Sequence, residues 1–197
     1  MDYPPDIDPQ SGCRLPLPQR DELSPEAQLV YDSLADPGAT LRGLRGPGGI
    51  TLHSPGLVPY SRPLNHYLRY EAGLGGRVRE LAILTTARAL DSQFEWAAHE
   101  AEAGREGISP GIIDVIRYRR GTEGLKEADA VVIELGREIF EAKKVVPETF
   151  ARALRQFGRG ALVDLVALMG NYASTAALLT AFDMQLDPGV PPPFPME

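Results

Sequence analysis

Residues 78–104 of the chain, VRELAILTTARALDSQFEWAAHEAEAG, contain the pattern that decides the fold class. Apolar and small residues recur at helical spacing over 78–91, which predicts one helix. Ser92 is a favoured N-cap residue, and it predicts that a second helix begins there and continues through residue 104. Two helices in direct succession favour an all-α protein.

The sequence outside this pair predicts further helices and no strands. Ser24 followed by proline predicts a capped helix start, since proline is favoured at the first helical position. Pro59 and Pro63 are expected to split their segment into two short helices. We find no alternation of apolar and polar residues typical of strands. The further helices are expected over residues 24–36, 54–70, 109–118, 126–144, 147–157 and 161–185.

Proline and glycine separate a helical body from two non-helical ends. The chain has 18 prolines and 20 glycines, and only two of the prolines fall within residues 64–186. We therefore expect an extended Pro-rich arm over 1–23, a helical domain over 24–186 and a polyproline II tail over 187–197. Residues 38–49 are rich in glycine and are expected to form a flexible loop, without the GxxxxGK[ST] pattern of a phosphate-binding loop.

Composition argues against several classes of partner. Twenty basic and 27 acidic residues give a net charge of −7, and no run of five Lys or Arg occurs, so nucleic acid is not an expected ligand. The N-terminus lacks the basic and apolar regions of a secretory signal. Residues 161–182 come nearest to a membrane span, but Asp164 and Asn171 interrupt them. We expect a soluble, cytoplasmic protein with no membrane partner.

Cysteine chemistry is restricted to one residue. Cys13 is the only cysteine, which excludes an intrachain disulfide and a metal site built from several cysteines. It lies in the Pro-rich N-terminal stretch, and we interpret it as incidental to catalysis. Pairing with a cysteine of another molecule stays open.

The most informative histidine is His99, four residues after Glu95. This spacing puts both side chains on one face of a helix, where a carboxylate can orient an imidazole that acts as a general base. A structural alternative is a capping box, in which Glu95 bonds only the backbone N–H of Ser92. Spacing alone does not decide between the two.

Two segments carry a resemblance to a known family: residues 79–84, RELAIL, and 92–100, SQFEWAAHE. They resemble the carboxymuconolactone decarboxylase family and its alkylhydroperoxidase (AhpD-like) relatives. The resemblance extends over residues 67–181 and is most specific at the Glu-Leu-Ala-Ile start and the Glu-Trp-x-x-His core. It implies an AhpD-like helical bundle that associates as a homo-oligomer.

The alignment that the resemblance implies also indicates which chemistry is missing. In the peroxidase branch a glutamate, a Cys-x-x-Cys pair and a histidine form a thiol relay, and the resemblance aligns Glu80 with the glutamate and His99 with the histidine. Ser92 and Glu95 then occupy the two cysteine positions. Without either sulfur, dithiol peroxidase turnover is not expected.

What remains resembles the decarboxylase branch, which implies a cofactor-independent, metal-free lyase or isomerase acting on a small organic acid, lactone or ketone. Glu80, Glu95 and His99 are then the expected catalytic residues. For substrate binding we expect Ser92 as a weak hydroxyl, and Trp96 as a pocket wall or a core residue. A substrate carboxylate would need a cation.

Two arginines are candidates for that cation. Arg88 lies two turns beyond Glu80 on the same helix face, and Arg79 is adjacent to Glu80. We expect Arg88 to bind the substrate, with Arg79 as the second candidate; a plain surface arginine is the alternative reading of each.

Three alternatives stay open at this point. Glu95 and His99 could ligate a metal together with Glu80 or His66. A diverged member of the family could carry out hydrolytic or oxidative chemistry. The chain could also be a non-catalytic scaffold that binds a small molecule. His53 and His66 are interpreted as structural residues that could also cover the pocket.

Overall fold

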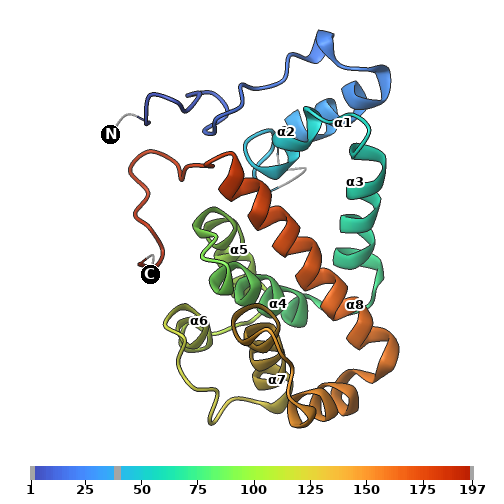
Figure 1. Cartoon of the computed structure of the whole chain (residues 1–197), viewed down its shortest axis with the longest axis vertical. Helices are drawn as coiled ribbons and strands as arrows, with labels where there is room; N and C mark the ends of the chain where they lie inside the picture. Colours follow the sequence, from blue (N-terminus) through green and yellow to red (C-terminus); the bar gives the residue numbers. More distant parts are fainter. Residues whose placement is uncertain (1–2, 38–40, 196–197) are drawn as a thin grey trace. The chain divides into compact units, whose positions relative to one another are not determined.

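The computed structural model describes residues 3–37 and 41–195, and this part of the chain is helical without a strand (Figure 1). The expected all-α fold class is confirmed. Short 3₁₀ (η1, Arg20–Glu22) and π-helical (η2, Tyr67–Glu71; η3, Glu138–Ala142) segments supplement the α-helices. The α-helices are α1 Pro25–Ala35, α2 Pro47–Leu52, α3 Val58–His66, α4 Gly76–Ala89, α5 Gln93–Arg105, α6 Pro110–Arg117, α7 Glu127–Arg137 and α8 Pro147–Ala181.

The chain divides into two compact units. The first unit contains the residues up to Leu64 together with Ala177–Pro192, and the second contains Asn65–Ala176 together with the residues from Pro193 on. This division differs from the arm, helical domain and tail expected from the sequence. The helix α8 contributes residues to both units.

The N-terminal segment is folded, which corrects the expectation of an extended arm. Asp8 forms a side-chain turn, since its Oδ1 accepts hydrogen bonds from the backbone N–H groups of Gln10 and Ser11 at 2.9 and 2.8 Å. Cys13 is 2% exposed. The backbone N–H of Arg14 donates to the carbonyl of Phe182 at 2.9 Å, which ties the segment to the rest of the first unit.

Local residues decide several helix boundaries, and the first of them agrees with the expectation. The Ser24 side chain caps α1 by accepting a hydrogen bond from the N–H of Ala27 at 3.3 Å. The helix α3 is not split, because Pro59 lies in the first turn, where its missing N–H costs nothing, and only Pro63 removes an internal hydrogen bond. The loop expected over 38–49 ends earlier, because α2 begins at Pro47. Its residues 38–40 lie outside the described residues.

In the C-terminal helices, the sequence pattern is sufficient to predict where the helix breaks. A single residue, Gly158 (φ 74°, ψ 174°), breaks α8 between the two helices predicted over 147–157 and 161–185. Only glycine adopts this conformation readily, so the break is encoded locally. The helix ends at Ala181, four residues before the expected end.

The core of the second unit forms around α4, which packs against α5 and α7. Nine consecutive residues of α4, Glu80 to Arg88, are buried. A helix buried on every side carries its polar residues into the interior, and this brings Glu80 among the apolar side chains of the unit. The apolar pattern of this segment therefore places Glu80 in the interior, where the candidate site lies.

The helix α8 is long and apolar enough, by length and composition, to cross a membrane, and 39% of its most apolar window is buried. Leu165, Leu168 and Met169 of this helix belong to the core of the second unit. A core helix of a water-soluble protein meets the same criteria of length and composition.

Candidate active site

The centre of the site is a hydrogen bond between α4 and α5. The Nδ1 of His99 lies 2.7 Å from Oε2 of Glu80, and the side chains are 4% and 0% exposed. The two residues are 19 positions apart in the chain, so helix packing brings them together. A bond this short between buried groups indicates a strong, charge-assisted interaction.

Glu95 completes the cluster from the same helix as His99. Its Oε1 lies 3.3 Å from Nε2 of His99, as expected for residues four apart on a helix. The capping-box alternative is wrong, because the Ser92 side chain makes no capping bond and its N–H donates instead to the carbonyl of Ala87 at 2.8 Å. Both imidazole nitrogens of His99 therefore face carboxylates.

Arg79 holds Glu80 from the other side. Its Nε donates to Oε1 of Glu80 at 3.0 Å, and its Nη2 donates to Oε1 of Glu106 at 3.0 Å. A third bond, 3.1 Å long, runs from Nη1 to the carbonyl of Arg69. Both oxygens of Glu80 thus have partners, and this carboxylate is fixed in position.

The charges of the cluster support each other. Burial alone would lower the pKa of His99, but the hydrogen bonds to Glu80 and Glu95 outweigh it and raise the pKa above 6.5. Burial alone would raise the pKa of Glu80, but the contacts with His99 and Arg79 lower it below 4.5. Each charge thus favours the charged form of its neighbour: the carboxylate contacts favour the imidazolium of His99, and His99 and Arg79 favour the carboxylate of Glu80.

Tyr172 packs on the imidazole. Its ring meets that of His99 edge-on, with centroids 5.2 Å apart and an interplanar angle of 85°. Burial raises the pKa of the Tyr172 hydroxyl well above 10, so this group stays protonated. In the sequence, the only signal of Tyr172 is its polar atom within the apolar stripe of its helix.

Arg88 does not fit its expected role as the substrate cation near Glu80. Its Nε donates to the carbonyl of Arg117 at 2.8 Å, it pairs with Asp91, and its guanidinium lies 4.6 Å from the ring centroid of Phe194. Eight residues of helix separate Arg88 from Glu80, a rise of about 12 Å. Sharing a helix face did not bring them together.

Trp96 and Ser92 are also part of the interior. Trp96 is 0% exposed, donates its Nε1–H to Glu100 at 2.8 Å and meets Phe194 edge-on at 5.4 Å. These contacts are those of a core residue, the alternative that the sequence left open. Ser92 is buried at the start of α5, three positions before Glu95.

The metal alternative lacks a ligand set within residues 3–37 and 41–195, where no group of three His, Cys, Asp or Glu side chains is arranged to hold an ion. The nitrogens of His99 face Glu80 and Glu95. His66 lies at the surface, with its Nε2 3.2 Å from Glu71. In the first unit, Nε2 of His53 lies 2.9 Å from the carbonyl oxygen of Pro16.

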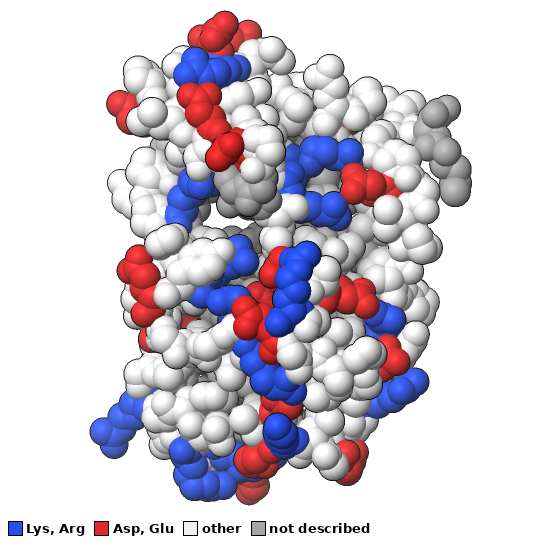
Figure 2. Space-filling model, turned by 180° about the vertical axis from the view of Figure 1, so that it is seen from behind, with Lys and Arg blue, Asp and Glu red and all other residues white. Residues whose placement is uncertain are grey.

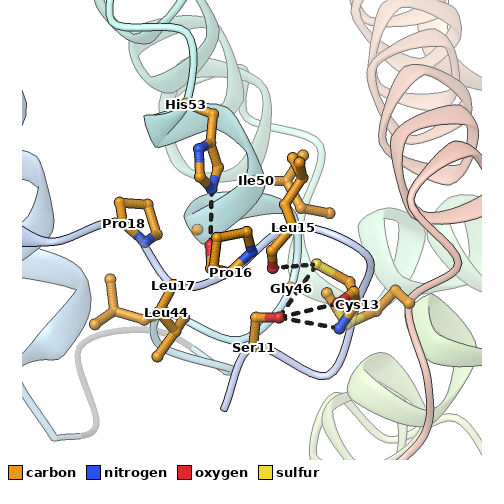
Figure 3. A pocket seen from close by; sticks show the side chains of 12 residues that line it. Ser11, Cys13, Leu15, Pro16, Leu17, Pro18, Leu44, Gly46, Ile50 and His53 are labelled. Carbon is orange, nitrogen blue, oxygen red and sulfur yellow. Dashed lines mark hydrogen bonds between the residues drawn. The ribbon is translucent and has the colours of Figure 1, made fainter. Parts of the chain in front are cut away.

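Cys13 belongs to the first unit and not to this cluster. Its Sγ donates to the carbonyl of Leu15 at 3.4 Å and lines a small pocket beside Pro16 and Ile50 (Figure 3). The pocket has room for about one water molecule. The thiol is therefore buried among residues of the first unit.

The surface carries both signs of charge. On the face seen in Figure 2, basic and acidic side chains are interleaved. On this face the described basic side chains form no continuous stripe of the kind that tracks a phosphate backbone.

Comparison with known proteins yields no match to a family model and none to a curated protein. The chemistry of the site is therefore inferred from its own residues and contacts.

Proposed function

We propose that the chain is a cofactor-independent acid–base enzyme of the cytoplasm, similar to carboxymuconolactone decarboxylases, which acts as a lyase or isomerase on a small organic acid, lactone or ketone. The observation that carries the proposal is His99, buried and held at 2.7 Å from Glu80 and 3.3 Å from Glu95. Perturbed titratable groups clustered in an interior are typical of catalytic sites.

The residues divide into positioning and proton-transfer roles. Glu80 is fixed by Arg79 and sets the orientation and charge of His99 through Nδ1. The longer contact lies at Nε2, where Glu95 and His99 share the proton that is delivered. This division follows the general pattern of an orienting carboxylate and a reacting imidazole.

In the lyase reaction the bond between the substrate carboxylate and its neighbouring carbon breaks, and carbon dioxide leaves. The electron pair passes into the adjacent carbonyl as an enolate. The enolate carbon then takes the proton of the His99–Glu95 pair, which water replaces. The sum is one carboxylate and one proton converted into carbon dioxide and a C–H bond. An isomerase would use the same pair to move a proton between two carbons.

Burial limits how substrate reaches the pair. Glu80, Glu95 and His99 are 0%, 5% and 3% exposed, so proton transfer occurs away from bulk water. Substrate entry then requires a covering segment to move, as in enzymes with lids.

A non-catalytic scaffold is the second candidate, because the same near-complete burial suits a structural ion network. A screen of small keto acids and lactone acids separates the two. Carbon dioxide release by the wild type in the presence of a metal chelator, lost in His99→Gln, supports the enzyme. A folded wild type that turns over none of these acids favours the scaffold.

A homo-oligomer is proposed as the working state. The outer face of α8 in the second unit exposes apolar side chains, with Val163 67% and Val166 39% exposed. Burying such a face against a second copy removes apolar area from water. Light scattering after size-exclusion chromatography tests this; a mass near 21.4 kDa at micromolar concentration would contradict it.

A further inference from the structure

A substrate carboxylate needs a cation, and both arginines expected for this role from the sequence are already engaged. Arg88 is engaged at the far end of α4. Arg79 is next to the cluster but already pairs with the carboxylates of Glu80 and Glu106 at 3.0 Å each. Binding a further anion there would break an existing buried pair, which is costly.

Arg69 is a different kind of arginine. It lies in the π-helical segment η2, a type of irregular turn that is frequent at functional sites. Its side chain is half-buried, and its Nε is buried with no hydrogen-bond partner among the described residues. Within that part of the chain it forms no ion pair, although its guanidinium lies over the ring of Tyr70 at 5.1 Å.

Two contacts put Arg69 beside the cluster. Its carbonyl accepts the hydrogen bond from Nη1 of Arg79, the residue that fixes Glu80. The guanidinium of Arg79 lies 5.8 Å from the centroid of the Tyr70 ring, and the guanidinium of Arg69 lies over the same ring. The positive charge of Arg69 also acts on Tyr172: burial raises the pKa of that hydroxyl, and Arg69 opposes the rise. Tyr172 in turn contacts His99.

The charges around Arg69 favour the binding of one anion. Arg79 and His99 are balanced by Glu80 and Glu95 in the interior, and Glu106 lies at the rim with 37% of its side chain exposed. Arg69 adds a positive charge that no described carboxylate neutralises. A half-buried guanidinium presents a planar pair of donors suited to a carboxylate.

We propose that Arg69 is the specificity-determining residue of this site and binds a carboxylate of the substrate while the reacting carbon faces Glu95 and His99. The inference rests on the proposed acid–base function and deepens it. A carboxylate held by Arg69 keeps its negative charge, and loss of carbon dioxide from it would be opposed. The anchored carboxylate is therefore a spectator, and the reacting carbon lies beside another carbonyl or carboxyl group of the same molecule.

Calorimetric titration tests the anchor without turnover. Levulinate is a suitable probe, because its carboxylate is separate from its ketone and does not leave as carbon dioxide; its methyl ester is the uncharged counterpart. We expect the wild type to bind levulinate about 10- to 100-fold more tightly than the ester. Arg69→Gln should bring this ratio to about one, and Arg69→Lys should retain part of it, since a charge without the planar fork remains.

The matched control is Arg159→Gln, which removes the same charge from an exposed position of the second unit. It should keep the wild-type ratio. Circular dichroism confirms that each variant is folded. Equal affinity of the wild type for acid and ester, no binding of levulinate at millimolar concentration, or a wild-type ratio in Arg69→Gln would each overturn the anchor.

Failure of the anchor and failure of the proposed reaction have different signatures. A preference for the acid that disappears in Arg69→Gln supports the anchor even when no keto acid is turned over. Turnover of a keto acid with the same KM in Arg69→Gln overturns the anchor and leaves the acid–base reaction in place.

Discussion

The two units of the chain each contain a network of ion pairs, and the networks differ in their access to water. In the second unit, Arg79, Glu80 and His99 are linked by contacts of 2.7–3.0 Å and expose 14% or less of their side chains. In the first unit, Arg42 and Arg45 both pair with Asp187 at 3.0 and 3.1 Å, and the three side chains are 26–41% exposed.

Similar distances therefore correspond to different energetics. Water screens the pairs of the first unit, where an ion pair contributes about 0–1 kcal/mol. Charges in the second unit have lost their hydration, which costs several kcal/mol per ion and is offset only by good geometry and additional hydrogen bonds. A buried network that gains so little net stability over apolar packing is a candidate for a function.

The largest expected effect concerns catalysis. Replacing His99→Gln keeps the size and part of the hydrogen bonding but removes titration near neutral pH. The chemical step should slow by roughly 10²–10⁴ once a substrate is known, measured as kcat of the folded fraction. His66→Gln is the control, since His66 is 62% exposed and pairs with Glu71 away from the cluster. Wild-type kcat in His99→Gln would remove His99 from the mechanism.

The next effect concerns stability. Glu80→Gln removes one partner of a fully buried pair and leaves His99 and Arg79 without their shared carboxylate. The free energy of unfolding should fall by about 3 kcal/mol, measured by urea denaturation. Glu123→Gln, a change at an exposed loop position, should stay within about 0.5 kcal/mol of the wild type. Equal losses in both variants would contradict a special role of burial.

The buried network of the second unit is also expected to make the stability of the fold depend on pH. Because the folded state raises the pKa of His99 above 6.5, the stabilisation is complete below pH 6.5 and is lost as pH rises through the folded pKa. Glu80 has a lowered pKa, so its stabilisation is present above pH 4.5 and is lost as pH falls through its folded pKa. Stability should therefore be highest between these limits.

Urea denaturation from pH 5.5 to 9 measures the loss of stability that is expected as the pH rises. The free energy of unfolding should fall by at most about 1.4 kcal/mol per pH unit for the one proton involved. His99→Gln should reduce this slope. An unchanged slope in that variant would assign the titration to another group.

A smaller effect is expected in the first unit. Asp187→Asn removes the carboxylate shared by Arg42 and Arg45. The loss should be below about 1 kcal/mol, and high salt should reduce the difference from the wild type, since exposed charges are screened. Thermal unfolding at low and high ionic strength measures both. A loss as large as that of Glu80→Gln would remove the contrast between the units.

The smallest effect on activity is expected from Cys13→Ser. The sulfur lies in the first unit, and Ser92 and Glu95 stand at the positions that the proposed resemblance aligns with two cysteines. Turnover should be unchanged, and neither form should consume hydroperoxide with a dithiol reductant. Thiol-dependent peroxide consumption by the wild type that is lost in this variant would overturn the acid–base proposal.

Sequence reasoning succeeded where the decisive interaction is local. The cap at Ser24, the break in α8 at Gly158 and the approach of Glu95 to His99 each depend on residues within a few positions of one another. Backbone conformational preferences and helical spacing suffice for such features. Only the resemblance to a known family suggests that Glu80 and His99 belong to one site, since no spacing rule joins residues 19 positions apart.

Tertiary structure decided the rest. The bond of Arg88 to the carbonyl of Arg117, the bond of Arg14 to Phe182 and the edge-on contact of Tyr172 with His99 each join segments that are distant in the chain.

The sequence by itself determined an all-α chain, most helix ends and the polar residues carried by α4 and α5. Only packing decided which of these residues lose water, because solvent exclusion arises when several helices close around a side chain. Packing also decides which charged groups meet, and these contacts raise the pKa of His99 and lower that of Glu80 against the effect of burial.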